Sequence, residues 1–223
     1  MAYKNVLFDL DGTLTDPKVG ITKSVKYALD KLGIIVDDID SLKKFIGPPL
    51  KESFQNYYGM DDIKADDAIK YYREYFSGNG IFENELYENI EKVLSYLAKN
   101  NFTIIVATSK PRIFAEKIIN HFNLTKYFLA IEGSELNGTR SDKGELIFYI
   151  LNKYNLSAMH SIMIGDREHD IRGANKNSID SIGVGYGYGT EEELVNSGAK
   201  YFVKNIDELS EILKKKCPTT ASS

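Results

Sequence analysis

Residues 6–16 read VLFDLDGTLTD, and the predicted fold is organised around this stretch. Its apolar start runs into two acids, Asp9 and Asp11, which are followed directly by Gly12. On a β-strand, side chains two residues apart point the same way, so both carboxylates leave the strand end on one face. Gly12 lets the backbone turn sharply after them, because it has no Cβ. Buried carboxylates lose hydration, and a bound cation offsets that loss, so the stretch predicts a metal site at a strand end.

The length and charge of the chain limit its class. A chain of 223 residues suits one domain, or one domain that carries a smaller insertion. Its net charge of −4 argues against a nucleic-acid polymer as partner, since such binding usually needs a basic face. A small anionic molecule remains compatible with this charge, because local positive groups can recruit it.

Targeting and redox features predict a cytoplasmic protein. Residues 1–5 lack the apolar core of a signal peptide, and no apolar run is long enough to span a membrane. The single cysteine, Cys217, is expected in a polar tail, where it forms no internal disulfide and suits a reducing compartment. Residues 217–223 are low in apolar content, so we expect them to be disordered and exclude them from the fold.

After the first strand, the periodicity becomes helical. Apolar spacing predicts helices over residues 19–32, 42–46, 50–58 and 65–76, with no strand between residues 17 and 85. The segment Gly47-Pro48-Pro49 interrupts this block, because proline cannot donate to a helical hydrogen-bond ladder.

From residue 87 onward, helices and strands alternate. We expect strands at 103–107, 127–131, 161–164, 181–184 and 201–203, separated by helices at 90–99, 114–122, 172–175, 191–195 and 206–215. Pro111 suits a first helical position, and Asp142 suits the N-cap of a further helix, with Glu145 as its reciprocal partner. Alternation of this kind predicts an α/β fold with a parallel sheet.

The first strand can join that sheet only if the helical block is an insertion. We therefore expect a discontinuous α/β core formed by residues 1–16 and 86–216, carrying an α-helical cap domain formed by residues 17–85. Ligands of such sheets bind beyond the carboxyl ends of the strands.

The strand ends gather polar residues. Besides the first two acids they offer Thr108, Ser109, Asp166 and Asp170, and Lys143 begins a nearby helix. Two bare acids about 4 Å apart repel by about 4 kcal/mol at an effective dielectric of 20, and a hard divalent cation offsets this repulsion. Carboxylates and phosphate oxygens suit Mg²⁺, whereas the lack of histidine at these ends disfavours zinc.

These residues resemble the haloacid dehalogenase superfamily, specifically its phosphatases with a helical cap. The resemblance covers about residues 3–216 and rests on four motifs in order: Asp9-Leu10-Asp11-Gly12-Thr13, Thr108, Lys143, and Gly165-Asp166-Arg167-Glu168-His169-Asp170. It implies a Rossmann-like parallel sheet, a Mg²⁺ cofactor and a small phosphorylated metabolite as substrate. The whole pattern is most similar to the phosphoglycolate phosphatase and 5′-nucleotidase branch.

The resemblance also implies roles for the two acids of the first strand. Asp9 is expected to be the nucleophile that becomes an aspartyl phosphate. Asp11 is expected to protonate the leaving alcohol and then activate water, which requires a raised pKa.

The remaining roles concern the metal and the phosphoryl group. The resemblance implies that Asp9, the backbone carbonyl of Asp11, Asp166 and Asp170 hold Mg²⁺. Thr108, Lys143 and the backbone around Ser109 are expected to bind the phosphoryl oxygens.

Each role has a plainer alternative. Thr108 could cap a helix, Lys143 could be solvated, and Asp170 could only orient the site. Lys110 could steer anions or be a surface lysine. Three further residues of the last motif are expected to lie in a solvated loop without a catalytic role: Arg167, Glu168 and His169. The aromatic residues of the helical block are expected to pack within the cap: Tyr71, Tyr72, Tyr75 and Phe76. Gly47 and Pro48 could form a specificity loop over the site or a simple interhelical turn.

Departures from relatives favour hydrolysis of a phosphate monoester. Asp11 disfavours dehalogenation and phosphonate cleavage, since members with those activities lack the second acid. Residues 45–50 contain no arginine of the kind that phosphomutases use for a second phosphate. The alternatives are a phosphotransferase or sugar phosphomutase of the same fold, and a signalling domain that holds a phosphoryl group without turnover. Whether the protein is a monomer or a dimer stays open.

Overall fold

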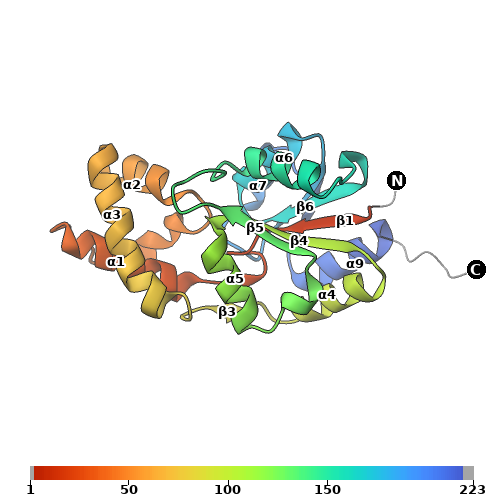
Figure 1. Cartoon of the computed structure of the whole chain (residues 1–223), viewed down its shortest axis with the longest axis horizontal. Coiled ribbons are helices and arrows are strands. Elements are labelled where there is room, and N and C mark those ends of the chain that lie inside the picture. Colours follow the sequence, from red (N-terminus) through yellow and green to blue (C-terminus); the bar gives the residue numbers. More distant parts are fainter. Residues whose placement is uncertain (1–2, 218–223) are drawn as a thin grey trace, which may run out of the picture.

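A parallel six-stranded sheet forms the centre of the protein (Figure 1). The computed structural model describes residues 3–217. The sheet order is β5-β4-β1-β6-β7-β8, and every neighbouring pair is parallel. The strands are β1 (Asn5–Phe8), β4 (Thr103–Pro111), β5 (Ala130–Ser134), β6 (Ser161–Gly165), β7 (Asp180–Val184) and β8 (Tyr201–Val203). The predicted α/β class with a parallel sheet is confirmed.

The register of β1 fixes where the two acids that follow it lie. Phe8, the last residue of β1, pairs with Val106 on one side and Ile164 on the other. The amide of Asp9 continues the ladder and donates to the carbonyl of Ile164 at 2.9 Å. The residues that follow the three central strands therefore meet at one edge of the sheet.

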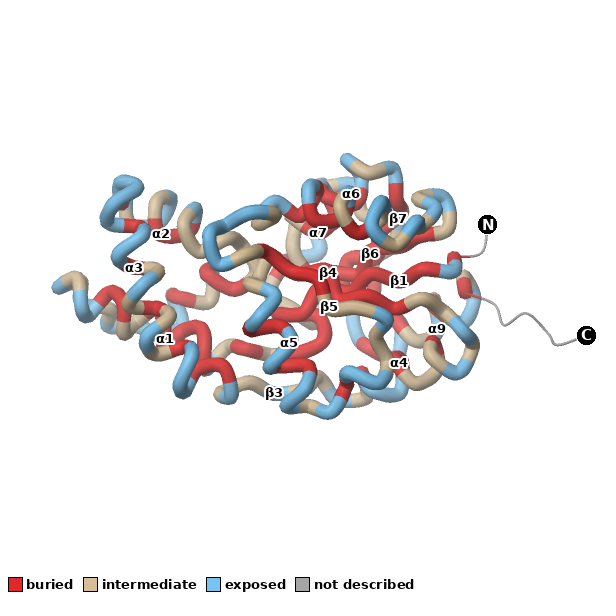
Figure 2. Tube along the Cα trace, viewed as in Figure 1, coloured by how far each residue is buried: buried red, intermediate tan, exposed pale blue. Residues whose placement is uncertain are grey.

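Helices cover both faces of the sheet, because alternate strand residues point to opposite sides. Val6 and Phe8 contribute to the core beneath α4 (Ile90–Lys99), α5 (Arg112–His121) and α9 (Ile206–Lys216). Leu7 points the other way and packs with α6 (Lys143–Lys153) and α7 (Glu168–Lys176). The short helix α8 (Glu191–Asn196) connects β7 to β8. Figure 2 shows the strands as the most buried part of the chain.

Helices between β1 and α4 form a separate layer at the left of Figure 1. It contains α1 (Lys18–Lys31), a 3₁₀ turn (Ile39–Phe45), α2 (Leu50–Tyr58), α3 (Asp62–Tyr75) and a π-helical turn (Phe76–Gly80). We call this layer the cap. The domain limits drawn at residues 16, 85 and 216 stay a prediction.

A short ribbon joins cap and core. β2 (Thr15–Asp16) pairs antiparallel with β3 (Glu85–Leu86), so the chain leaves and re-enters the core side by side. The predicted absence of strands between residues 17 and 85 fails only at Glu85, the first residue of β3, while the partner strand β2, just before this range, was not predicted. A strand of two residues has no alternating pattern, which is why the sequence did not reveal it.

Two other boundaries differ from expectation. The strand predicted over 127–131 begins only at Ala130, because Thr125–Tyr127 form a 3₁₀ turn. Pro111 is the N-cap of α5 rather than its first helical residue. Asp142 caps α6 as predicted, and its side chain accepts a hydrogen bond from the Glu145 amide at 2.8 Å. The predicted reciprocal bond, in which the Glu145 carboxylate would accept the Asp142 amide, does not occur among the described residues.

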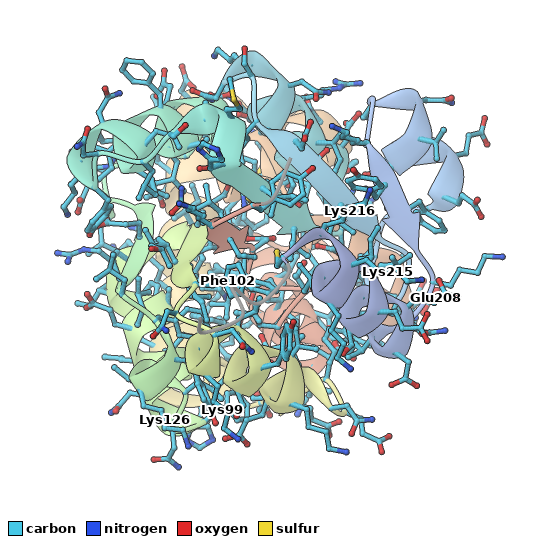
Figure 3. The ribbon with its side chains drawn as sticks, turned by 90° about the vertical axis from the view of Figure 1, so that its right-hand side faces the viewer. Lys99, Phe102, Lys126, Glu208, Lys215 and Lys216 are labelled. Carbon is cyan, nitrogen blue, oxygen red and sulfur yellow. The ribbon has the colours of Figure 1, made fainter. Side chains whose placement is uncertain are left out.

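The far end of the sheet, opposite the cap, is polar (Figure 3). Lys99 ends α4 there, and Lys215 and Lys216 lie in the last turn of α9. Positive side chains at helix C-termini interact favourably with the helix dipoles. This end carries none of the predicted site residues, which gather at the cap side.

Contrary to the prediction from the sequence, Cys217 does not belong to a polar tail. It is buried with 0% exposure, and its amide donates to the Leu213 carbonyl at 2.7 Å, so it closes α9 against the core. The sequence placed it in the tail because its neighbours are polar. The remainder of that tail, 218–223, lies outside the described residues.

We predict that the thiol of Cys217 is unreactive in the folded protein. Burial raises its pKa to about 12, so little thiolate forms at pH 8. A chromogenic disulfide reagent should label it fully in guanidinium chloride but negligibly in buffer. Cys217→Ala, which removes the chain's single thiol, is the blank. Rapid labelling of the native protein would contradict burial at this position.

Candidate active site

Three acids predicted at two strand ends meet in space. Asp9 follows β1, Asp166 follows β6, and Asp170 lies in the first turn of α7. All three are buried, and a carboxylate oxygen from each lies within 4.8 Å of the others. This is the cluster that the sequence placed at the carboxyl edge of the sheet.

Lys143 joins two of these acids. Its ammonium lies 2.8 Å from Asp9 Oδ1 and 2.7 Å from Asp170 Oδ1, and it donates to the Ala107 carbonyl at 2.8 Å. Lys143 is only 4% exposed, so the alternative of a solvated lysine is wrong. Burial lowers its pKa, but the carboxylates of Asp170 and Asp9 outweigh burial and raise the pKa overall.

Backbone geometry holds Asp166 in place. Its Oδ2 accepts the Tyr188 amide at 2.8 Å, and the Thr13 hydroxyl donates to Oδ1 at 3.4 Å. Gly12 has a φ of +84°, and a Cβ there would lie 2.1 Å from Asp166 Oδ2. Position 12 therefore needs glycine for two reasons: its backbone conformation disfavours other residues, and the Asp166 carboxylate lies where a Cβ would be.

The charge of the cluster fits a divalent cation. Three carboxylates against one ammonium leave two negative charges uncompensated when all groups are ionised. Burial raises the pKa of Asp166, with Asp170 and Asp9 adding to the rise. Burial also raises the pKa of Asp170 to about 6, although Lys143 opposes it. An all-oxygen set of this charge suits Mg²⁺, while the role of the Asp11 carbonyl stays a prediction.

Asp11 points away from this cluster toward a different cation. Its Oδ2 lies 2.9 Å from Lys110 Nζ, and its Oδ1 is buried without a hydrogen-bond partner among residues 3–217. Burial raises the pKa of Asp11, Lys110 lowers it, and Asp9 raises it further. The two acids of the first strand therefore have separate surroundings, one with Lys143 and one with Lys110.

Lys110 is not a surface lysine, since its side chain is only 6% exposed. Its Nζ lies 4.4 Å from the ring centroid of Phe76, a cap residue, which is a favourable cation–π distance. The cap thus contributes directly to the surroundings of Asp11. The sequence offered a signal for Lys110, because it lies two residues after Thr108 at a strand end.

Thr108 and Ser109 line the same region. Thr108 is buried, and its hydroxyl accepts the Lys110 amide at 3.2 Å. This bond lies in the last part of β4, where the pairing register with β5 shifts, and the N-cap of α5 is Pro111, so Thr108 does not cap that helix. The Ser109 carbonyl accepts the Ser134 hydroxyl at 2.8 Å. Their predicted role in binding phosphoryl oxygens stays a prediction.

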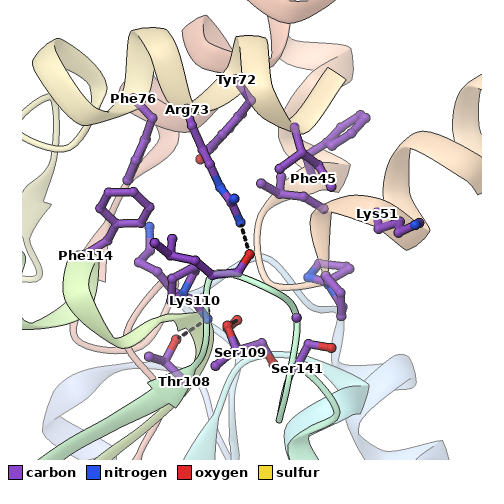
Figure 4. Close-up of a pocket in the computed structure, with 18 of the residues that line it drawn as sticks. Phe45, Lys51, Tyr72, Arg73, Phe76, Thr108, Ser109, Lys110, Phe114 and Ser141 are labelled. Atoms are coloured by element: carbon purple, nitrogen blue, oxygen red, sulfur yellow. Dashed lines mark hydrogen bonds between the residues drawn. The ribbon is translucent and has the colours of Figure 1, made fainter. Parts of the chain in front are cut away.

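A cavity of about 600 Å³ lies between cap and core beside these residues (Figure 4). Core residues Asp9, Asp11, Thr108, Ser109 and Lys110 line it on one side. The cap side includes Phe45, Gly47, Pro48, Tyr72, Arg73 and Phe76. Tyr72 and Phe76, predicted as cap packing, do stack at 5.3 Å, and they also form a wall of this cavity.

The loop at Gly47 and Pro48 serves as a turn and also lines the cavity. Gly47 has a φ of +102°, and a Cβ there would lie 2.7 Å from Arg167 Cγ. A side chain at this position would therefore strain the loop. Pro48 lacks this restriction, and its predicted effect on specificity stays a prediction.

Arg167 was expected in a solvated loop, and this was wrong. It is half-buried at the N-cap of α7, pairs with Glu193 at 3.0 Å, and donates to the Ile46 carbonyl of the cap at 2.7 Å. Glu168 and His169 form the first turn of α7. Loop prediction failed here because short helices with a charged first turn carry little apolar periodicity.

Comparison with known proteins identifies the family. The model of the haloacid dehalogenase-like hydrolase family matches residues 6–184. The chain belongs to this family. It is therefore an enzyme, a hydrolase of the phosphatase type, as the sequence resemblance implied. None of the described helices of this hydrolase is long and apolar enough to cross a membrane.

Curated relatives of this hydrolase carry three kinds of name. A 5′-nucleotidase from Pseudomonas aeruginosa is 46% identical over 96% of this chain and 97% of its own length. The tyrosine-protein kinase PtkA of Mycobacterium tuberculosis is 34% identical over 93% of this chain and 72% of its own. A phosphoglycolate phosphatase from Colwellia psychrerythraea is 26% identical over 94% and 96%.

A solved structure supports the fold of this hydrolase. A predicted phosphatase from Clostridium acetobutylicum is 52% identical, covers 96% of this chain and 100% of its own, and superimposes with a TM-score of 0.95. The Rossmann-like core of the family and its helical layer are therefore common to both chains.

We predict that Lys143→Met destabilises this hydrolase strongly. The variant removes the cation between two buried carboxylates, and breaking a buried ion pair in this way costs about 3–5 kcal/mol. Urea unfolding without metal should show the loss. Lys176→Met is the matched control, because this exposed lysine on α7 forms only a surface pair, worth about 0–1 kcal/mol. Equal stability of the two variants would contradict the proposed charge balance.

Proposed function

We propose that this protein is a Mg²⁺-dependent phosphatase that hydrolyses a small phosphate monoester through an aspartyl phosphate on Asp9. The observation that supports it best is the buried group of Asp9, Lys143, Asp166 and Asp170 beside a cavity that also contains Asp11. Substrate, metal and acid–base residue can thus meet at one edge of the sheet.

The first step forms a covalent intermediate. A carboxylate oxygen of Asp9 attacks phosphorus while the bond between phosphorus and the alcohol oxygen breaks. Lys143 fixes Asp9 Oδ1, so the other oxygen is the one free to attack. Asp11 gives its proton to the departing alcohol oxygen, and burial supports this role by raising its pKa.

The second step releases phosphate. Asp11, now ionised, takes a proton from water, whose oxygen attacks phosphorus and frees the Asp9 carboxylate. Bound Mg²⁺, held by Asp9, Asp166 and Asp170, would neutralise charge on the phosphoryl oxygens. Lys143 adds a second positive charge next to Asp9.

The relatives suggest two substrate classes. The one named 5′-nucleotidase is 46% identical and the one named phosphoglycolate phosphatase is 26% identical, which favours a nucleoside 5′-monophosphate over phosphoglycolate. A phosphotransferase remains the second candidate, because PtkA is 34% identical. A phosphotransferase would pass the phosphoryl group from Asp9 to an acceptor other than water.

Release of inorganic phosphate from p-nitrophenyl phosphate tests this proposal. Wild type should release phosphate with Mg²⁺ and stop with EDTA, and Asp9→Asn should lower kcat by at least about a thousandfold, since the nucleophile is lost. Acid quench of wild type should trap phosphate on the protein. No hydrolysis of any of a panel of phosphate esters would refute the phosphatase, and stable phospho-Asp9 without turnover would favour the signalling alternative.

Lys110→Met should move the pH dependence of kcat. Asp11 must be protonated to act as the acid, so activity falls as pH rises through its pKa. The Lys110 charge lowers that pKa, and its removal lets the pKa rise. The basic limb of the profile therefore shifts to higher pH, whatever the change in maximal rate. Lys117→Met, exposed on α5, should leave the limb in place, and an unshifted limb in Lys110→Met would contradict the role of Asp11.

A further inference from the structure

Arg73 is a cap residue whose charge the proposed mechanism does not use. It lies near the end of α3, is half-buried, and lines the cavity. Figure 4 shows its side chain extending from the cap toward the core. One terminal nitrogen, Nη2, donates to the Leu136 carbonyl at 2.9 Å across the cavity mouth.

The guanidinium has no acidic partner in the described chain. Burial lowers the pKa of Arg73, and the neighbouring Tyr72 opposes this effect. A guanidinium offers five N–H donors, and a partly desolvated cation without a counter-charge is costly. By contrast, Lys51 at the same cavity pairs with Asp62 and Asp66. A bound molecule is the natural source of the missing acceptor.

The position of Arg73 shows which part of a substrate it meets. The buried Tyr72 lines the cavity together with Arg73 and Asp11. Burial raises the pKa of its phenol, the Asp11 carboxylate raises it further, and the Arg73 guanidinium lowers it. Arg73 thus lies on the cap side of the cavity, across from the acids that would handle the phosphoryl group. The leaving group must occupy the space between.

That space is large and lined by aromatic side chains. Its volume of about 600 Å³ lies inside the range of roughly 300–1,000 Å³ that drug-sized ligands occupy. Phe45 and Tyr72 of the cap and Phe114 of the core line it. A leaving group of two carbons would leave most of this volume to water, whereas a ring would contact the aromatic wall.

We propose that Arg73 determines specificity by binding a carbonyl or carboxylate acceptor at the far end of the leaving group. The favoured substrates are then phosphate monoesters whose alcohol carries a ring bearing such an acceptor, and nucleoside 5′-monophosphates match this description. The inference rests on the proposed phosphatase function and adds the residue that recognises the leaving group. Arg73 contacts the leaving group and takes no part in phosphoryl transfer.

Matched substrates and variants test it. The kcat/KM of Arg73→Met should fall about ten- to a hundredfold for uridine 5′-monophosphate, the range of one charged hydrogen bond, and change less than about twofold for ribose 5-phosphate, which lacks the base. Phosphotyrosine and phenyl phosphate form a second pair, in which the acceptor is a carboxylate. Lys64→Met, exposed on α3 away from the cavity, is the control and should alter no ratio.

Each other outcome overturns the inference in a recognisable way. Equal loss on both members of a pair would mean that Arg73 only holds the cap through Leu136. An unchanged kcat/KM in Arg73→Met would show that Arg73 does not recognise the acceptor. A wild-type preference for ribose 5-phosphate or phosphoglycolate over uridine 5′-monophosphate would show the same. A wild-type protein inactive on every ester would refute the phosphatase itself, and the inference with it.

Discussion

The bridge that Lys143 makes between Asp9 and Asp170 is the interaction on which the site depends. Without a cation at this point, three carboxylates would be buried together at the edge of the sheet, and each would lose hydration without compensation. The bridge also ties three separate elements, because its members come from β1, α6 and α7.

A second arrangement connects the site to the cap. Lys110 comes from the core, pairs with Asp11 and lies over the ring of Phe76. Arg167 holds the carbonyl of Ile46 on another side. Both contacts cross between the layers, so the position of the cap determines the surroundings of Asp11. Such an arrangement excludes bulk water from the cavity only when cap and core are together.

Much of the site could be predicted because its chemistry is local. Asp9 and Asp11 follow the same strand closely, so their place at its carboxyl end could be predicted, and Gly12 indicates a turn after them. The end of β6 was identifiable from its apolar run, whereas β4 extends to Pro111, beyond the apolar run that ends at Ala107. Contacts that join distant segments carry no such signal. The surroundings of Arg167 and Cys217 were therefore predicted wrongly, and those of Lys110 were left open.

The α/β core, the family and the acids at the strand ends could be inferred from the sequence, because strand and helix periods and short motifs are properties of neighbouring residues. Only the tertiary structure decided that Asp9 faces Lys143 while Asp11 faces Lys110. It alone places Arg73 at the cavity, where none of residues 3–217 provides it with an acidic partner. These assignments depend on distances between segments far apart in the chain, which packing and burial set and which no local pattern encodes.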